Sequence, residues 1–261
     1  MNNRLLQKWH DREKSLGIWS NLPDIHVAEM LARTGADWIC FDLQHGLMDY
    51  TDLTRLLPAV TGTPATPLVR VAANQPDQIG KALDAGARGV IVPMVNTAED
   101  AGQAVTSCYY PPKGQRSCGP MRDAMLEGFS YLGTANEEVV CILMIETEEG
   151  LNNLESIAAV EGVSGLFVGP MDLCYGLGLP PGDFSNERFI SALKAILTAC
   201  ENNGLACGMF GYDASLAAKA LGDGFDFASV GSDVSFVREG VSQALAVARG
   251  EERSGPSRGG Y

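Results

Sequence analysis

Short apolar runs rich in branched and aromatic residues recur along the 261-residue chain. Runs of this length, bounded by turn-forming residues, are typical of strands that are buried on both faces. We expect eight such strands, at residues 15–19, 38–43, 67–71, 89–95, 138–146, 165–169, 205–211 and 225–231.

Segments with helical spacing separate these runs. In residues 25–35, Val27, Met30 and Leu31 share one face, and Gly35 marks the end of the helix. The same pattern recurs at residues 75–86, 97–108, 150–162, 186–204, 213–224 and 234–250. Eight strands alternating with helices predict a parallel sheet that closes into a TIM (β/α)8 barrel. A doubly wound open sheet is the alternative, but no GxGxxG fingerprint follows any of the strands.

The length fits one barrel domain, which we place at residues 1–248, and the Gly/Ser/Arg-rich residues 249–261 predict a disordered tail. No apolar run approaches the roughly 20 residues that cross a bilayer, and the start lacks the apolar centre of a signal peptide. Seven cysteines without a CxxC pair favour reduced thiols. We therefore expect a cytoplasmic protein without a membrane partner.

The formal net charge of −13, without a Lys/Arg cluster, argues against a nucleic-acid partner. An acidic protein that binds a small anion must concentrate positive charge locally, through an arginine or a metal ion.

Chemically capable side chains gather where the predicted strands end. In a (β/α)8 barrel these ends form the active site, so we expect the side chains to converge on one rim. They are Trp19, Asp42, His45, Arg70, Glu146 and Asp172.

Two of these carboxylates, Glu146 and Asp172, predict a hard metal site for Mg²⁺ or Mn²⁺, with Co²⁺ as a further candidate. Other roles stay open, because Asp42 and Asp172 also suit helix N-caps and His45 also suits a polar loop. No lysine ends a predicted strand, which argues against Schiff-base chemistry. Carbonyl chemistry here would need a metal ion to polarise the carbonyl group.

Several segments resemble the HpcH/HpaI family of class II, metal-dependent pyruvate aldolases, such as the 4-hydroxy-2-oxoheptanedioate aldolases. They are DWICFDLQHG, PLVRV, ALDAGARGVIVPMVNTAEDA, YPPKGQRSCGP, MIETEEGLNNLESIAAVEGVSGLFVGPMDL and FDFASVGSD. The resemblance implies reversible cleavage of 4-hydroxy-2-oxo acids to pyruvate and an aldehyde through a metal-bound pyruvate enolate. It also implies a homohexamer in which neighbouring subunits exchange a terminal helix. The apolar segment VSQALAVA fits this exchange and equally fits ordinary barrel closure.

The resemblance also assigns roles to individual residues. Glu146 and Asp172 would bind the divalent metal ion, and Arg70 would hold the keto oxygen of the substrate. His45 would act as the acid/base, and Asp84 would pair with it. The substrate carboxylate would bind backbone amides within the segment of Gly169, Pro170, Met171 and Asp172, and we add Trp19 as a substrate contact.

The chain departs from the family pattern at Gln44 and Met144, where many members carry glutamate and glutamine. These changes bear on the water network and on substrate preference. The longest irregular segment, residues 109–123 after the fourth strand, contains Arg116 and Arg122. These arginines would either meet an acidic aldehyde or neutralise an acidic subunit surface.

Three other functions compete with the aldolase. A CoA-thioester lyase of the citrate or malyl-CoA type would share the fold, but it needs a basic surface that this chain lacks. Decarboxylation of oxaloacetate would be a side activity, because it forms the same enolate. A catalytically silent barrel is the third alternative.

Overall fold

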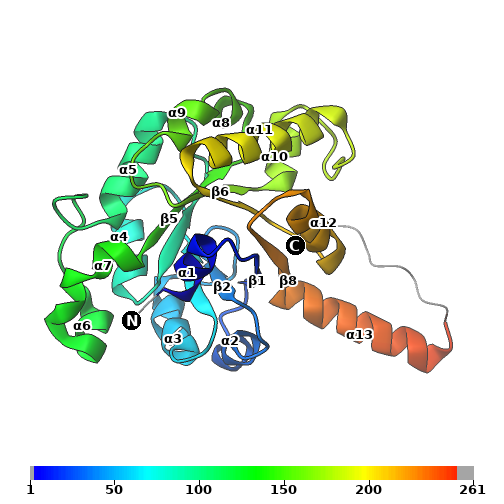
Figure 1. The fold of residues 1–261 in the computed structure, drawn as a ribbon. Coiled ribbons are helices and arrows are strands. Elements are labelled where there is room, and N and C mark those ends of the chain that lie inside the picture. The colour runs from blue at the N-terminus through cyan, green and yellow to red at the C-terminus, as the bar shows by residue number, and fades with distance from the viewer. Residues whose placement is uncertain (1–2, 252–261) are drawn as a thin grey trace.

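The computed structural model describes residues 3–251, and its strands form a closed parallel barrel in chain order (Figure 1). They are β1 (Ser15–Ser20), β2 (Trp38–Asp42), β3 (Thr66–Arg70), β4 (Gly89–Val92), β5 (Val140–Ile145), β6 (Gly165–Val168), β7 (Ala206–Met209) and β8 (Phe227–Ser232). The barrel prediction is confirmed, and the open sheet is wrong. Of the predicted tail, residues 252–261 lie outside the described part of the chain.

Helices surround the barrel wall. Those that overlap the predicted segments are α2 (Ile25–Ala32), α4 (Pro76–Asp84), α5 (Ala98–Cys108), α8 (Glu148–Asn152), α9 (Leu154–Ala158), α11 (Glu187–Asn203), α12 (Ala214–Asp223) and α13 (Asp233–Arg249). Those without a specific prediction are α1 (Arg4–His10), α3 (Tyr50–Val60), α6 (Met121–Glu127), the 3-10 helix η1 (Gly128–Gly133), α7 (Ala135–Glu138) and α10 (Pro170–Gly176). No helix within residues 3–251 is long and apolar enough to cross a membrane.

The barrel interior is filled by large side chains, as in other closed eight-stranded barrels. Trp19, Trp38, Phe167 and Phe227 are fully buried, and neighbouring rings among them lie about 5.5–6.4 Å apart between centroids. A Cβ at Gly17 would lie within 2.3 Å of the Trp38 ring, so this strand position has to be glycine. Helix α1 covers the amino end of the barrel, where Trp9 packs on Phe227.

The strand register determines which residues become neighbours at the carboxyl end of the barrel. Asp42 on β2 lies opposite Arg70 on β3. Ile145 at the end of β5 pairs with Val168 at the end of β6. The residues that follow these two strands, Glu146 and Gly169, therefore lie at the same level of the barrel. Residues from four different strands thus meet at one rim.

Helix α13 extends away from the barrel in Figure 1 and does not cover β8 and β1. Its first residue, Asp233, is buried, but Val237, Val241 and Leu245 are 47–57% exposed. The outward side chain of Leu16 on β1 is likewise 39% exposed. Within one chain, the last helix therefore does not complete the outer layer of the barrel, so ordinary barrel closure does not account for its apolar residues.

Candidate active site

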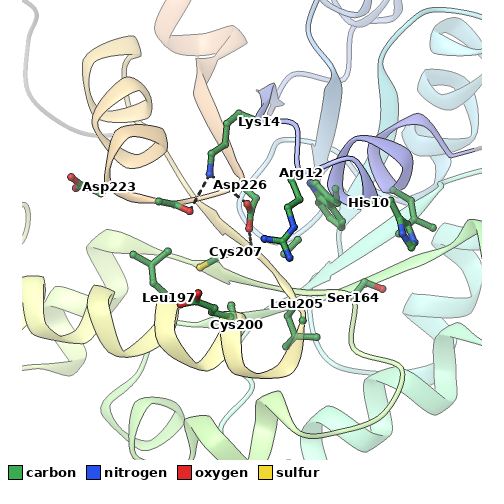
Figure 2. A pocket seen from close by; sticks show the side chains of 16 residues that line it. His10, Arg12, Lys14, Ser164, Leu197, Cys200, Leu205, Cys207, Asp223 and Asp226 are labelled. Atoms are coloured by element: carbon green, nitrogen blue, oxygen red, sulfur yellow. Dashed lines mark hydrogen bonds and ion pairs between the residues drawn. The ribbon is translucent and has the colours of Figure 1, made fainter.

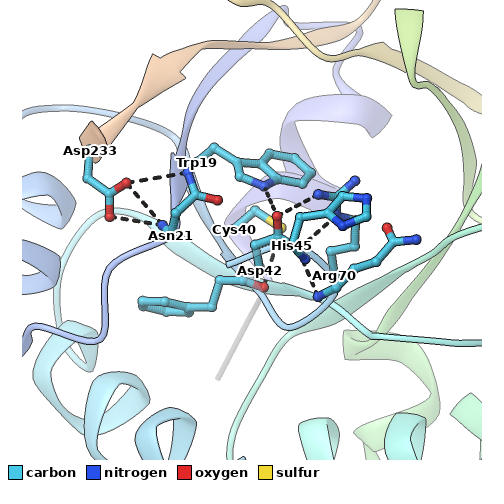
Figure 3. A network of polar contacts seen from close by, with 9 residues as sticks. Trp19, Asn21, Cys40, Asp42, His45, Arg70 and Asp233 are labelled. Carbon is cyan, nitrogen blue, oxygen red and sulfur yellow. Dashed lines mark hydrogen bonds and ion pairs between the residues drawn. The ribbon is translucent and has the colours of Figure 1, made fainter. Parts of the chain in front are cut away.

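A buried ion pair between Arg70 and Asp42 lies at this rim (Figure 3). Arg70 donates from Nε to Oδ1 of Asp42 at 2.9 Å and from Nη2 to Oδ2 at 2.5 Å. The indole N–H of Trp19 also donates to Oδ2, at 3.0 Å, and the Arg70 guanidinium lies over the Trp19 ring. This two-point contact fixes both the position and the plane of the guanidinium.

The carboxylate of Asp42 also shapes the turn that carries His45. Its Oδ1 accepts hydrogen bonds from the backbone N–H groups of Gln44 and His45. Burial raises the pKa of this carboxyl, but Arg70, Trp19 and the His45 amide outweigh burial and hold the pKa below its ordinary value. The helix N-cap interpretation of Asp42 is wrong, because Asp49 caps α3.

His45 itself lies on the exposed side of this turn, with its backbone fixed by Asp42. A Cβ at Gly46 would lie 2.2 Å from the backbone oxygen of Asp42, so the turn is too tight for any larger residue. His45 therefore lies on a short, well-braced turn, whose backbone is held by the same carboxylate that binds Arg70. This position suits a group that must exchange protons with a substrate and with water.

The carboxylate of Glu146 lies at the end of β5 and is 3% exposed. Oε1 accepts a hydrogen bond of 2.7 Å from the backbone N–H of Met94. A Cβ on Gly169 would lie only 2.8 Å from Oε2, which therefore faces the start of α10. Burial and the negative charge of Asp172 raise the pKa of Glu146, whereas the Met94 amide and Arg70 oppose this shift.

Asp172 is half-buried in the first turn of α10, and it does not cap that helix, because the N-cap is Gly169. The N-cap interpretation of Asp172 is therefore wrong. The negative charge of Asp172 raises the pKa of Glu146, which indicates that the two carboxylates lie close together. Two nearby carboxylates favour a cation between them.

This donor set fits a hard divalent cation. No cluster of three or more His, Cys, Asp or Glu side chains occurs among residues 3–251, so a site for structural zinc is absent from that part of the chain. Two carboxylates leave the other coordination positions to water or substrate, as Mg²⁺ and Mn²⁺ prefer.

Trp19 is only 1% exposed, and its N–H is already bonded to Asp42. This geometry indicates that Trp19 supports Arg70 and does not favour its predicted contact with a substrate. Met144, which is 2% exposed, lies beside Gly169, since a Cβ there would be 3.0 Å from its Cε atom. The thioether therefore forms an apolar wall next to the carboxylates.

Asp84 lies elsewhere. It is the last residue of α4, and because the helices run antiparallel to the strands it faces the amino end of the barrel, away from His45. Its Oδ1 accepts a hydrogen bond of 2.6 Å from Arg116, and burial raises its pKa although Arg116 opposes the shift. The pair predicted between Asp84 and His45 does not form within one chain, because the length of the barrel separates them.

The segment at residues 109–123 also belongs to the amino end, because it follows helix α5 and not strand β4 directly. Arg116 is buried against Asp84 and Tyr110, and Arg122 donates to the hydroxyl of Thr61. Within one chain neither arginine reaches the rim that carries Arg70.

A cavity of about 700 Å³ lies at the amino end as well, between α1, α11 and α12 (Figure 2). Lys14 and Asp226, two of its charged side chains, already form an ion pair with each other. The residues with the chemistry described above are not among those that line it.

Three residues brace the site in ways that the sequence does not predict. Asp42 is expected at the rim or as a helix N-cap, but not as the partner of Arg70. Met94 has no predicted role, and Asp233 is only the last residue of the segment FDFASVGSD. The carboxylate of Asp233 accepts hydrogen bonds from Ser20 Oγ and from the backbone N–H groups of Asn21 and Leu22, and so fixes the loop after β1 (Figure 3). The only feature of the sequence that indicates a role for Asp233 is its position directly after the eighth strand.

Comparisons with known proteins show which family the sequence and the fold resemble. The model of the HpcH/HpaI aldolase/citrate lyase family matches residues 15–239. A hydroxypyruvate/pyruvate aldolase of Rhizorhabdus wittichii is 36% identical over 95% of this chain and 99% of its own length. A crystal structure of an HpcH/HpaI aldolase/citrate lyase family protein from Burkholderia cenocepacia has a TM-score of 0.89 at 36% identity, covering 95% of this chain and 100% of that one. A citrate synthase, SbnG, has a TM-score of 0.85 at 29% identity, covering 95% and 98%.

Proposed function

Because the chain belongs to the HpcH/HpaI aldolase/citrate lyase family, we propose that it reversibly cleaves 4-hydroxy-2-oxo acids to pyruvate and an aldehyde. It is a carbon–carbon lyase of the aldolase class. The observation that carries the proposal is the convergence of Glu146 and Asp172 with the clamped Arg70 at one end of the barrel.

The divalent cation, Mg²⁺ or Mn²⁺ with Co²⁺ as a further candidate, would be held by Glu146 and Asp172, and it would polarise the keto group of the substrate. Arg70 supplies a fixed positive charge at the oxygen where the enolate charge develops. Asp42 keeps the guanidinium in place, so no reorganisation is needed during the reaction.

The substrate carboxylate would bind backbone N–H groups of Gly169, Met171 and Asp172 at the start of α10, while Pro170 has none to donate. His45 would take the proton of the C4 hydroxyl, the C3–C4 bond would break, and the aldehyde would leave. Protonation of the enolate at C3 then releases pyruvate. Trp19 would support Arg70 from beneath in this scheme.

A second copy of the chain enters this proposal for two reasons. Asp84 lies at the end of the barrel opposite His45, so the two can pair only between neighbouring subunits. The exposed apolar residues of α13 and the exposed Leu16 of β1 are complementary surfaces for an exchanged helix. We therefore propose a homo-oligomer, with the hexamer as the expected form, in the cytoplasm.

The first experiment is exchange of the methyl protons of pyruvate in D₂O, followed by NMR with Mg²⁺ and with EDTA as the control. It requires no knowledge of the aldehyde. We expect exchange that depends on the metal ion and falls at least about 100-fold in Glu146→Ala, because charge stabilisation at the enolate is lost. A folded wild-type protein that gives no exchange with Mg²⁺ or Mn²⁺ would contradict the proposal.

The likeness to a citrate synthase favours one further candidate, a lyase or synthase that uses a different carbonyl partner. The same enolate site would serve such a reaction. Cleavage of CoA thioesters such as malyl-CoA without any pyruvate exchange would favour this second function over the aldolase.

A further inference from the structure

Met94 adopts an unusual backbone conformation. Its φ is +56°, and within residues 3–251 the only other non-glycine residue with a positive φ is Arg12. Residues with a Cβ atom avoid this left-handed region because the Cβ crowds the backbone. The side chain of Met94 is 52% exposed, so packing of that side chain does not impose the conformation.

The conformation instead directs the backbone towards Glu146. Strand β4 ends at Val92, and the next residue, Pro93, has no N–H to donate. Met94 therefore supplies the first backbone N–H after the strand, and it donates to Oε1 of Glu146 at 2.7 Å. A hydrogen bond to a buried carboxylate at this distance is among the stronger ones in proteins.

The second oxygen of Glu146 is left in a different environment. No described residue donates a hydrogen bond to Oε2, and this oxygen faces Gly169, where even a Cβ would come within 2.8 Å. Asp172 follows in the first turn of the same helix, and its charge acts on Glu146. The two oxygens of Glu146 are therefore not equivalent.

We infer that Met94 is a positioning residue, whose left-handed backbone holds Oε1 of Glu146 so that Oε2 is presented to the divalent cation together with Asp172. The inference rests on the proposed function, since the cation belongs to that proposal. It assigns the role to the backbone of residue 94. An exposed methionine that touched the acceptor aldehyde would instead act through its side chain.

Four substitutions separate these two roles. Met94→Gly and Met94→Asn keep the N–H and tolerate a positive φ. Met94→Val keeps the N–H and an apolar side chain, but a branched residue strongly disfavours this φ, and Met94→Pro removes the N–H. Leu47→Val is the matched control, because it adds the same branching at another exposed apolar residue of the rim.

The measurement is the Kd for Mn²⁺ without substrate, from the EPR signal of free Mn²⁺, with the fold checked by circular dichroism. We expect the glycine, asparagine and Leu47→Val variants to stay within about three-fold of wild type. We expect the valine and proline variants to bind Mn²⁺ about 10–100-fold more weakly, which is the usual effect of losing a partner of a metal ligand. In these two variants saturating Mn²⁺ should bring kcat for pyruvate exchange close to the wild-type value, although the Kd for Mn²⁺ stays weakened.

Two results would overturn the inference. The first is the same Kd for Mn²⁺ in all variants. The second is a Kd that follows the apolar character of the side chain, so that Met94→Asn and Met94→Gly bind Mn²⁺ weakly and Met94→Val binds it like wild type. If the valine and proline variants do not fold, Met94→Ala against Met94→Asn repeats the comparison with an expected gap of about three-fold, since alanine also avoids this φ. An equal Kd for Mn²⁺ in these two variants would again overturn the inference. A wild-type protein that binds no Mn²⁺ would contradict the proposed function instead.

Discussion

The barrel holds a buried arginine–aspartate pair at each end, and the two pairs behave in opposite ways. At the carboxyl end Asp42 pairs with Arg70, and at the amino end Asp123 pairs with Arg88, at 2.8 Å. All four residues are at most 5% exposed. Yet the pKa of Asp42 lies below its ordinary value and that of Asp123 above it.

The difference lies in the number of donors around each carboxylate. Asp42 accepts from two atoms of Arg70, from the indole of Trp19 and from two backbone N–H groups. Asp123 has one bond, from Arg88, and its Oδ2 accepts none from the described residues. Burial raises the pKa of Asp123, and Glu127 adds to this effect. The comparison teaches that burial of a charge stabilises a defined geometry only where hydrogen bonds replace the lost water.

The largest expected contrast comes from removing each carboxylate charge. Asp42→Asn leaves Arg70 buried without its counter-charge, so we expect a loss of about 3–5 kcal/mol in the free energy of unfolding. We also expect pyruvate proton exchange to fall about 100-fold, because the guanidinium shifts. Asp123→Asn should cost much less stability and leave exchange within about three-fold. Urea unfolding and NMR exchange measure both, and equal effects of the two variants would contradict the comparison.

A smaller contrast concerns two glycines, one at each end. A Cβ at Gly169 would lie 2.8 Å from Glu146 Oε2, whereas a Cβ at Gly119 would lie 3.8 Å from Asp84 Oδ2, an ordinary contact. We expect Gly169→Ala to weaken Mn²⁺ binding about ten-fold, because the ligand oxygen must move. Gly119→Ala should leave the Kd unchanged. Titration calorimetry with Mn²⁺ decides, and an unchanged Kd for both variants would show that Oε2 is not the ligand oxygen.

The smallest contrast is in the pH dependence of stability. The lowered pKa of Asp42 means that its stabilisation is present above the unfolded value of 3.8 and is lost as the pH falls through the folded value. The raised pKa of Asp123 has the opposite sign: ionisation above the unfolded value costs stability in the folded state.

The cost of Asp42→Asn should therefore shrink as the pH falls below 4. The stability of Asp123→Asn relative to wild type should instead be most favourable near pH 7 and decline as the pH falls towards 4. Thermal unfolding between pH 3 and pH 7 measures the two trends. Parallel trends for the two variants would contradict the opposite pKa shifts.

The strands could be predicted because each is a compact apolar run. Glu146 and Asp172 could be selected as candidates because they interrupt or follow such runs. Asp42 as the clamp of Arg70 could not, since that contact depends on the register of β2 and β3. The positive φ of Met94 could not be predicted either, because a methionine in the sequence does not indicate a left-handed backbone.

Other errors had local causes. Helix α3 carries a capping box of Asp49 and Asp52 and a buried face that includes Leu53 and Leu57, so it was detectable from the sequence. The sequence predicts residues 109–123 after the fourth strand, but α5 intervenes and turns them to the other end of the barrel. For the same topological reason Asp84 and His45 cannot pair within one subunit, because a helix C-terminus faces the amino ends of the strands.

Asp233 joins the base of helix α13 to the loop after β1, next to Trp19, which bonds to Asp42. A force applied to the free end of that helix would therefore reach Arg70 of the candidate site through three contacts. In an assembly that exchanges α13, dilution would separate the subunits. The specific activity would then fall before any subunit unfolds. A half-life of activity measured against protein concentration would thus report on quaternary structure.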